Sequence, residues 1–153
     1  MGIYLNPGDQ SFRMALNSEI FVDKTDMIQY LNSVINTQQR FVSVSRPRRF
    51  GKTMAADMIC AYYDREADSR GLFEKRKLAD CPPLQTARQD IHWDEYLGKF
   101  DVIRLVMTDF FKQDIAVADS LTKMQRLVIR DLQKKYSEVE FFDDKDLIQC
   151  FAD

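Results

Sequence analysis

The segment of residues 41–63 constrains the fold more than any other part of the chain, and it reads FVSVSRPRRFGKTMAADMICAYY. Three of its first four residues, Phe41 to Val44, are aromatic or β-branched, which predicts a buried strand. Pro47 ends this strand because proline cannot donate to a strand ladder. From Lys52 to about Tyr63, apolar residues recur at spacings of three and four, which predicts a helix.

The rest of the 153-residue chain, which has the length of one domain, alternates between helical and strand patterns. A second strand is predicted at Val102 to Met107. Helices are predicted from Asp26 to Ile35, near Leu72 to Leu78, from Leu121 to Tyr136, and after Asp143 or Asp144. Residues 1–18 are predicted to be loop-rich, and residues 19–22 to form a strand or an extended arm. Because helices alternate with strands, we expect an α/β fold with a parallel sheet.

The loop between the first strand and its helix ends in Gly51-Lys52-Thr53. Phosphate-binding loops have this order of strand, loop and helix, because backbone N–H groups and the positive end of the helix dipole then face the phosphates. Glycine allows a close approach of the backbone, lysine reaches the β- and γ-phosphates, and the threonine hydroxyl can bind Mg²⁺. The match departs from the general pattern at Arg46, where a glycine is expected.

The charge around this loop leaves two other interpretations open. No acidic residue lies between Asp26 and Asp57, and this interval contains Arg40, Arg46, Arg48, Arg49 and Lys52. The basic side chains could form a solvated edge beside an ordinary helix start. Alternatively, the loop could contact a nucleic-acid backbone, although Phe50 is the one aromatic residue interleaved among the cations.

Composition excludes several other classes of protein. The net charge of −2 excludes a protein that works through bulk positive charge. Three cysteines, one histidine and the lack of a CxxC pair argue against a disulfide framework or a zinc site. No apolar run approaches the ~18 residues of a membrane span, and the N-terminus has no secretory pattern. We therefore expect a reduced, cytoplasmic protein that does not bind a membrane.

Several strings together resemble the AAA-ATPase-like family of bacterial proteins. They are RPRRFGKT with FVSVS before it, FVDKTDMIQYLN upstream, GIYLNPG near the N-terminus, CAYYD at the helix end and FDVIRLVMTDF at the second strand. In that family an arginine also stands where the general loop has glycine. The resemblance implies a P-loop NTPase-like sheet, a Walker A loop, and ATP and Mg²⁺ as cofactors. The nucleotide-binding residues it implies are Pro47, Arg48, Arg49, Phe50, Gly51, Lys52 and Thr53, with Thr53 on Mg²⁺.

Two further positions are weighed as parts of this site. Asp109 follows the second predicted strand, at the edge where ligands lie in open α/β sheets, so it could stand near Mg²⁺; it could equally cap a turn. Asp23 and Lys24 lie where related NTPases have a segment flanking the adenine. The alternative is that Asp23 or Thr25 only caps the following helix.

The resemblance also implies that this sequence is the N-terminal portion of a single P-loop domain. Its expected parts are residues 1–38 (arm and helix), 39–64 (strand, phosphate loop and helix) and 65–153 (second strand and helices). Family members continue with an acidic Walker B strand such as IDEYD, and often with a PD-(D/E)XK nuclease-like domain; no IDEYD-like string occurs here. We therefore expect no catalytic residue in this chain, and ATP hydrolysis only in longer family members.

The alternative function is a non-hydrolysing module that binds a nucleotide or a nucleic-acid backbone. Expected partners are a nucleotide, the missing C-terminal region or a second copy, and nucleic acid only weakly.

Overall fold

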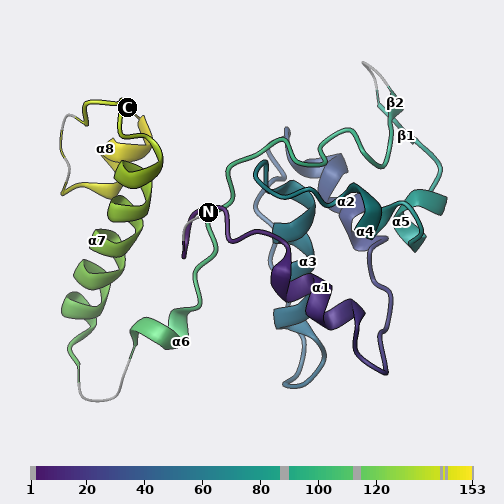
Figure 1. Ribbon diagram of the computed structural model, residues 1–153, viewed down its shortest axis with the longest axis horizontal. Coiled ribbons are helices and arrows are strands. Elements are labelled where there is room, and N and C mark those ends of the chain that lie inside the picture. Colours follow the sequence, from purple (N-terminus) through teal and green to yellow (C-terminus); the bar gives the residue numbers. More distant parts are fainter. Residues whose placement is uncertain (1–2, 87–89, 112–114, 142, 144, 153) are drawn as a thin grey trace. The chain divides into compact units, whose positions relative to one another are not determined.

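The computed structural model describes residues 3–86, 90–111, 115–141, 143 and 145–152. Its contacts divide the chain into two compact units. The continuous unit is Gly8–Val102, and the terminal unit combines Met1–Pro7 with Ile103–Asp153. The structure is mixed α/β and mostly helical; the sheet in its described part has two antiparallel strands (Figure 1).

The continuous unit contains five helices and this small sheet within its described residues. They are α1 (Gln10–Leu16), α2 (Met27–Val34), α3 (Lys52–Tyr63), α4 (Arg70–Phe73), α5 (Lys77–Asp80), β1 (Leu84–Gln85) and β2 (Asp90–Ile91). Leu84 pairs with Ile91, and Gln85 pairs with Asp90. Helix α1 lies against α3, as Figure 1 shows. Fully buried side chains from α1 to α5 form one core: Phe12, Ile28, Ala61, Tyr62, Phe73 and Leu78.

A buried hydrogen-bond network joins α2 to the end of α3. Asn32 donates from Nδ2 to the Tyr62 hydroxyl at 2.9 Å and accepts at Oδ1 from the Tyr63 hydroxyl at 2.7 Å. The Tyr62 hydroxyl donates in turn to the carbonyl of Trp93 at 2.6 Å. Burial raises the pKa of Tyr62 to about 12 and that of Tyr63 further, so both hydroxyls remain protonated donors at neutral pH. The network fixes the helix that carries the loop of residues 46–51.

The two ends of the continuous unit meet at Asp64, which is fully buried just after α3. Its Oδ2 accepts a hydrogen bond from the backbone N–H of Gly8 at 2.7 Å. Its backbone forms an isolated parallel bridge with Phe100, whose carbonyl accepts from the N–H of Arg65 at 2.9 Å. A buried carboxylate needs such partners because an unpaired one would be strongly destabilising.

The terminal unit is built around α7 (Val117–Lys135), with α6 (Met107–Phe110) and α8 (Leu147–Ala152) packed against it. Its core contains Leu5, Val128, Ile129, Leu132 and Cys150. Asp131 of α7 holds the N-terminal segment, because its Oδ2 accepts from the backbone N–H groups of Ile3 and Tyr4, both at 2.8 Å. No helix in the described ranges is both long and apolar enough to cross a membrane.

The prediction of a buried strand at Phe41 to Val44 is wrong. Residues 41–47 form neither a helix nor a strand, no bridge partner for them lies in the described part of the chain, and Phe41 is 84% exposed. A β-prone sequence becomes a strand only when a neighbouring strand satisfies its backbone groups. The expected parallel sheet is accordingly not among the described elements.

The second predicted strand, Val102 to Met107, is reduced to a single bridge. Ile103 pairs with Leu5 in antiparallel orientation, and the N–H of Arg104 donates to the carbonyl of Tyr4 at 2.9 Å. Met107 already begins α6. Of the two alternatives predicted for residues 19–22, the strand is not formed.

Most of the predicted helices are confirmed. Helix α3 spans the predicted residues, and α2, α7 and α8 lie where the apolar spacing places them. The helix predicted near Leu72 to Leu78 is divided into α4 and α5. Residues 1–18 are not all loop, because α1 forms there around the buried Phe12.

Candidate functional site

The loop of residues 46–51 is shaped by two left-handed backbone positions. Arg49 has φ 69° and Gly51 has φ 77°. Glycine adopts this conformation without penalty, whereas a side chain at Gly51 would be strained. Gly51 is also where the chain turns into α3, and its carbonyl accepts from the N–H of Ala55 at 2.9 Å. The loop therefore ends with the free N–H groups of the first turn of α3 next to it.

Lys52, the first residue of α3, folds its side chain back over the loop. Its Nζ donates to the carbonyls of Arg46 and Pro47, the second at 3.3 Å. Lys52 and Thr53 are both exposed. The two carbonyls accept two of the three N–H donors of this ammonium, which therefore has a donor left for another acceptor near the loop.

An open cavity of about 500 Å³ lies beside this loop in the continuous unit. Its wall combines three cations and one carboxylate with apolar side chains. The lining residues are Lys24, Asp26, Met27, Val44, Arg46, Phe50, Gly51, Lys52 and Ala55. With Lys24, Arg46 and Lys52 against Asp26, the wall carries an excess of positive charge.

The cavity includes only some of the residues predicted from the sequence. Phe50, Gly51 and Lys52 line it, whereas Pro47, Arg48, Arg49 and Thr53 belong to the same loop and helix start but are not among its lining residues. Arg46, which departs from the general loop pattern, does line it. Apolar spacing places Met27 and Ala55 on helix faces but not in a site, because their contribution to the cavity depends on how α2 and α3 pack.

Lys24 reaches the loop from a separate segment. Its Nζ donates to the carbonyl of Phe50 at 3.2 Å. Asp23 does not cap α2 but folds its own turn: its Oδ1 accepts from the backbone N–H and the hydroxyl of Thr25, at 2.9 and 2.7 Å. Its Oδ2 accepts from the N–H of Lys77 at 3.1 Å. Partial burial alone would raise the pKa of Asp23, but these hydrogen bonds outweigh it and hold the pKa below its ordinary value.

Asp109 lies in α6 of the terminal unit and is exposed. Its position in a helix, rather than at the end of a strand, removes the geometric reason for predicting it near Mg²⁺. Across the described ranges, no group of three or more His, Cys, Asp or Glu side chains is arranged to hold a metal ion.

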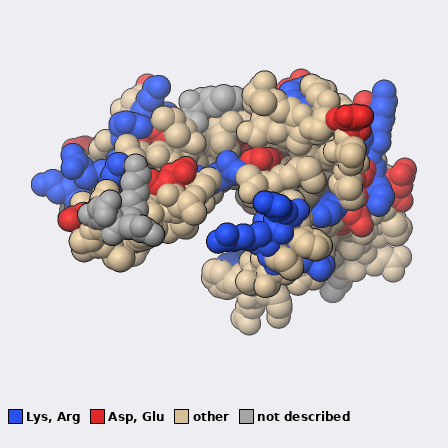
Figure 2. Space-filling view, turned by 90° about the horizontal axis from the view of Figure 1, so that it is seen from below, with Lys and Arg blue, Asp and Glu red and all other residues tan. Residues whose placement is uncertain are grey.

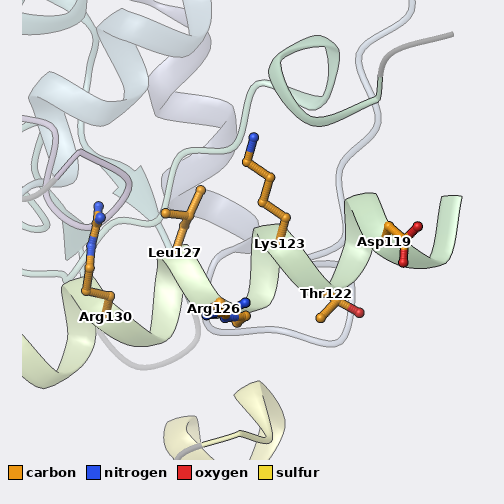
Figure 3. Close-up of a pocket in the computed structure, with 6 residues that line it drawn as sticks. All are labelled: Asp119, Thr122, Lys123, Arg126, Leu127 and Arg130. Carbon is orange, nitrogen blue, oxygen red and sulfur yellow. The ribbon is translucent and has the colours of Figure 1, made fainter. Parts of the chain in front are cut away.

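A second cavity, of about 600 Å³, lies along α7 in the terminal unit. Figure 3 shows that Lys123, Leu127 and Arg130 extend from the same side of this helix. Residues four and three apart share a helix face, so the arrangement follows directly from the spacing. This cavity lacks the glycine, the loop backbone and the helix start that accompany the first.

The comparison with protein families decides the assignment. Residues 8–152 match the family described as Predicted AAA-ATPase, AAA-ATPase-like. The chain belongs to the AAA-ATPase-like family. Membership in the AAA-ATPase-like family implies nucleotide binding in general, with ATP and a divalent metal as the expected ligands. Comparisons with curated proteins and with solved structures found no match.

Proposed function

We propose that this AAA-ATPase-like chain binds ATP with Mg²⁺ through the loop Pro47 to Thr53. The observation that carries the proposal is the cavity beside this loop, whose wall Lys24, Arg46 and Lys52 share with Gly51. An ATP polyphosphate carries several negative charges, and phosphates bind where cations and the N-terminus of a helix converge.

The residues present fit a nucleotide in two respects. A Cβ placed on Gly51 would lie 3.6 Å from the Lys24 Nζ, so the missing side chain leaves room for a ligand next to that ammonium. The apolar side chains of Met27, Val44 and Phe50 offer a surface for a base on the same cavity wall.

Phosphate oxygens would replace the backbone carbonyls as acceptors for Lys52. The carbonyls of Arg46 and Pro47 are neutral, whereas hydrogen bonds between two charged groups are shorter and stronger. Bound Mg²⁺ would neutralise phosphate charge, and the Thr53 hydroxyl is the group in this loop suited to hold it. The proposal is limited to binding; hydrolysis remains a prediction for longer family members with a Walker B strand.

Replacing Lys52 with alanine tests the proposal. A charge-assisted contact contributes about 1.5–3 kcal/mol, so Lys52→Ala should weaken ATP binding about tenfold or more. Lys75→Ala is the matched control, because Lys75 is an exposed lysine of the same unit that does not line the cavity. Titration of fluorescent ATP into the three proteins gives the affinities, and ATP turnover on the same samples separates binding from hydrolysis. Equal affinities for wild type and Lys52→Ala would refute the site.

We expect nucleic acid to be a weak partner. Lys and Arg side chains form several separate groups on the face shown in Figure 2, with Asp and Glu among them. The net charge of −2 also works against a polyanion. Binding to single-stranded DNA should therefore fall steeply as salt rises, and a salt-resistant, sub-micromolar complex would contradict this expectation.

A further inference from the structure

Lys24 is the cation of the cavity that the phosphate-loop pattern does not include. It lies 26 residues before Phe50 in the sequence, yet its Nζ contacts the Phe50 carbonyl at 3.2 Å and lies beside Gly51. In the described part of the chain, no carboxylate forms an ion pair with it. Within these residues, the hydrogen-bond acceptor of its ammonium is the neutral carbonyl of Phe50.

The backbone on both sides of Lys24 is anchored. Thr25 is fully buried, and its hydroxyl oxygen accepts from the N–H of Leu78 at 3.1 Å while its proton goes to Asp23. Asp23 in turn accepts from the N–H of Lys77. Both neighbours of Lys24 are therefore hydrogen-bonded to the start of α5, and these bonds restrain the backbone at Lys24.

The exposed ammonium of Lys24 therefore faces the loop from a backbone segment that is hydrogen-bonded to α5. A carbonyl oxygen is a weaker partner for an ammonium than a phosphate oxygen, since the second bond is between opposite charges. The site already has an excess of cations over carboxylates, which a polyphosphate would compensate. A binding residue held in place before the ligand arrives loses less entropy on binding.

We propose that Lys24 is a second phosphate-binding residue of the nucleotide site, acting with Lys52 from a separate segment of the chain. The inference rests on the proposed ATP site and identifies a residue that loop patterns do not predict. The Asp23–Thr25 turn is then the support that positions this residue.

Two substitutions separate the charge of Lys24 from its contact with the loop. Lys24→Gln removes the charge but keeps an N–H donor for the Phe50 carbonyl, whereas Lys24→Arg keeps the charge. We expect Lys24→Gln to weaken Mg²⁺–ATP binding about fivefold to tenfold, and Lys24→Arg to stay within about threefold of wild type. Lys75→Gln is the control for loss of one exposed positive charge and should bind ATP like wild type.

Adenosine provides the ligand without phosphates. Lys24→Gln should bind adenosine as wild type does, because the lost interaction is with the phosphates. Equal weakening for adenosine and ATP would overturn the inference in favour of a contact with the base. ATP affinity equal to that of Lys75→Gln would also overturn it and leave Lys24 as a brace of the loop. In that case Lys52→Ala would still lose affinity, whereas failure of wild type to bind ATP would refute the site and the inference together.

Discussion

Replacing Asn32 with alanine should destabilise the continuous unit strongly, because Asn32 is the centre of the network between α2 and α3. The substitution leaves the buried Tyr63 hydroxyl without its acceptor and deletes the hydrogen bond from Asn32 to Tyr62. A stranded buried donor costs about 1–3 kcal/mol and a lost hydrogen bond about 0.5–1.5 kcal/mol. Tyr62 keeps its bond to the Trp93 carbonyl, so we expect a total loss of about 2–4 kcal/mol.

Trp93 makes the measurement direct. It is the only tryptophan of the chain, it packs against the core of the continuous unit, and its carbonyl accepts from Tyr62. Urea unfolding followed by Trp93 fluorescence therefore reports this unit, and the midpoint should fall while the slope with denaturant stays unchanged. Ser33→Ala is the control on α2, because Ser33 is exposed and its hydroxyl donates to the Tyr30 carbonyl of its own helix.

The partner residue provides a second check. Tyr63→Phe removes the donor, and the double variant with Asn32→Ala should cost less than the sum of the two single variants, since both break the same bond. A loss below about 0.5 kcal/mol for Asn32→Ala, the range of ordinary surface changes, would refute the assigned role of the network.

Three further predictions concern other parts of the chain. Asp131→Ala should destabilise the terminal unit by about 3 kcal/mol, because two backbone donors lose a charged acceptor, and hydrogen exchange at these two amides should accelerate. Gly51→Ala should lower stability by about 1–2 kcal/mol because of its left-handed φ, whereas Gly71→Ala, at a position without positive φ and with open space, should not; thermal melting compares them. The pKa of Asp23 is lowered by folding, so its stabilisation is complete above about pH 4 and lost as pH falls through the folded pKa. Asp23→Asn should therefore reduce the acid sensitivity of unfolding between pH 5 and pH 2, and an unchanged pH profile would contradict this.

Helices were the predictable part of this fold. The period of apolar residues places α3 and α7 because a helix satisfies its own backbone and needs only one apolar face. The start of α8 shows the limit of such detail: Asp146 accepts from the N–H of Ile148 in this helix, whereas Asp143, one of the two predicted caps, accepts from the N–H of Lys145. The other predicted cap, Asp144, lies outside the described residues. Neighbouring aspartates are equally suitable caps by residue type, so the sequence does not show which one caps the helix; local backbone geometry decides.

Strands were not predictable, because their hydrogen bonds lie outside the segment that forms them. Phe41 to Val44 has strand composition, but composition does not supply a neighbour. Within the site, the loop and Lys52 follow from the sequence pattern, whereas the position of Lys24 depends on the hydrogen bonds of Asp23 and Thr25 with α5. These hydrogen bonds join segments that are far apart in the sequence, and no periodic pattern of residues predicts them.

The meeting of Gly8, Asp64 and Phe100 has a consequence for the order of folding. Asp131 and Ile3 are 128 residues apart, and closing a flexible loop of that length costs about 4 kcal/mol in entropy. Once the continuous unit has folded, Asp64 has already joined its two ends, so only short connections to residues 3–5 and 103 remain to be ordered. During synthesis at ~5–20 residues per second, the N-terminal residues wait roughly 6–25 seconds for Asp131, and the continuous unit can form in that interval.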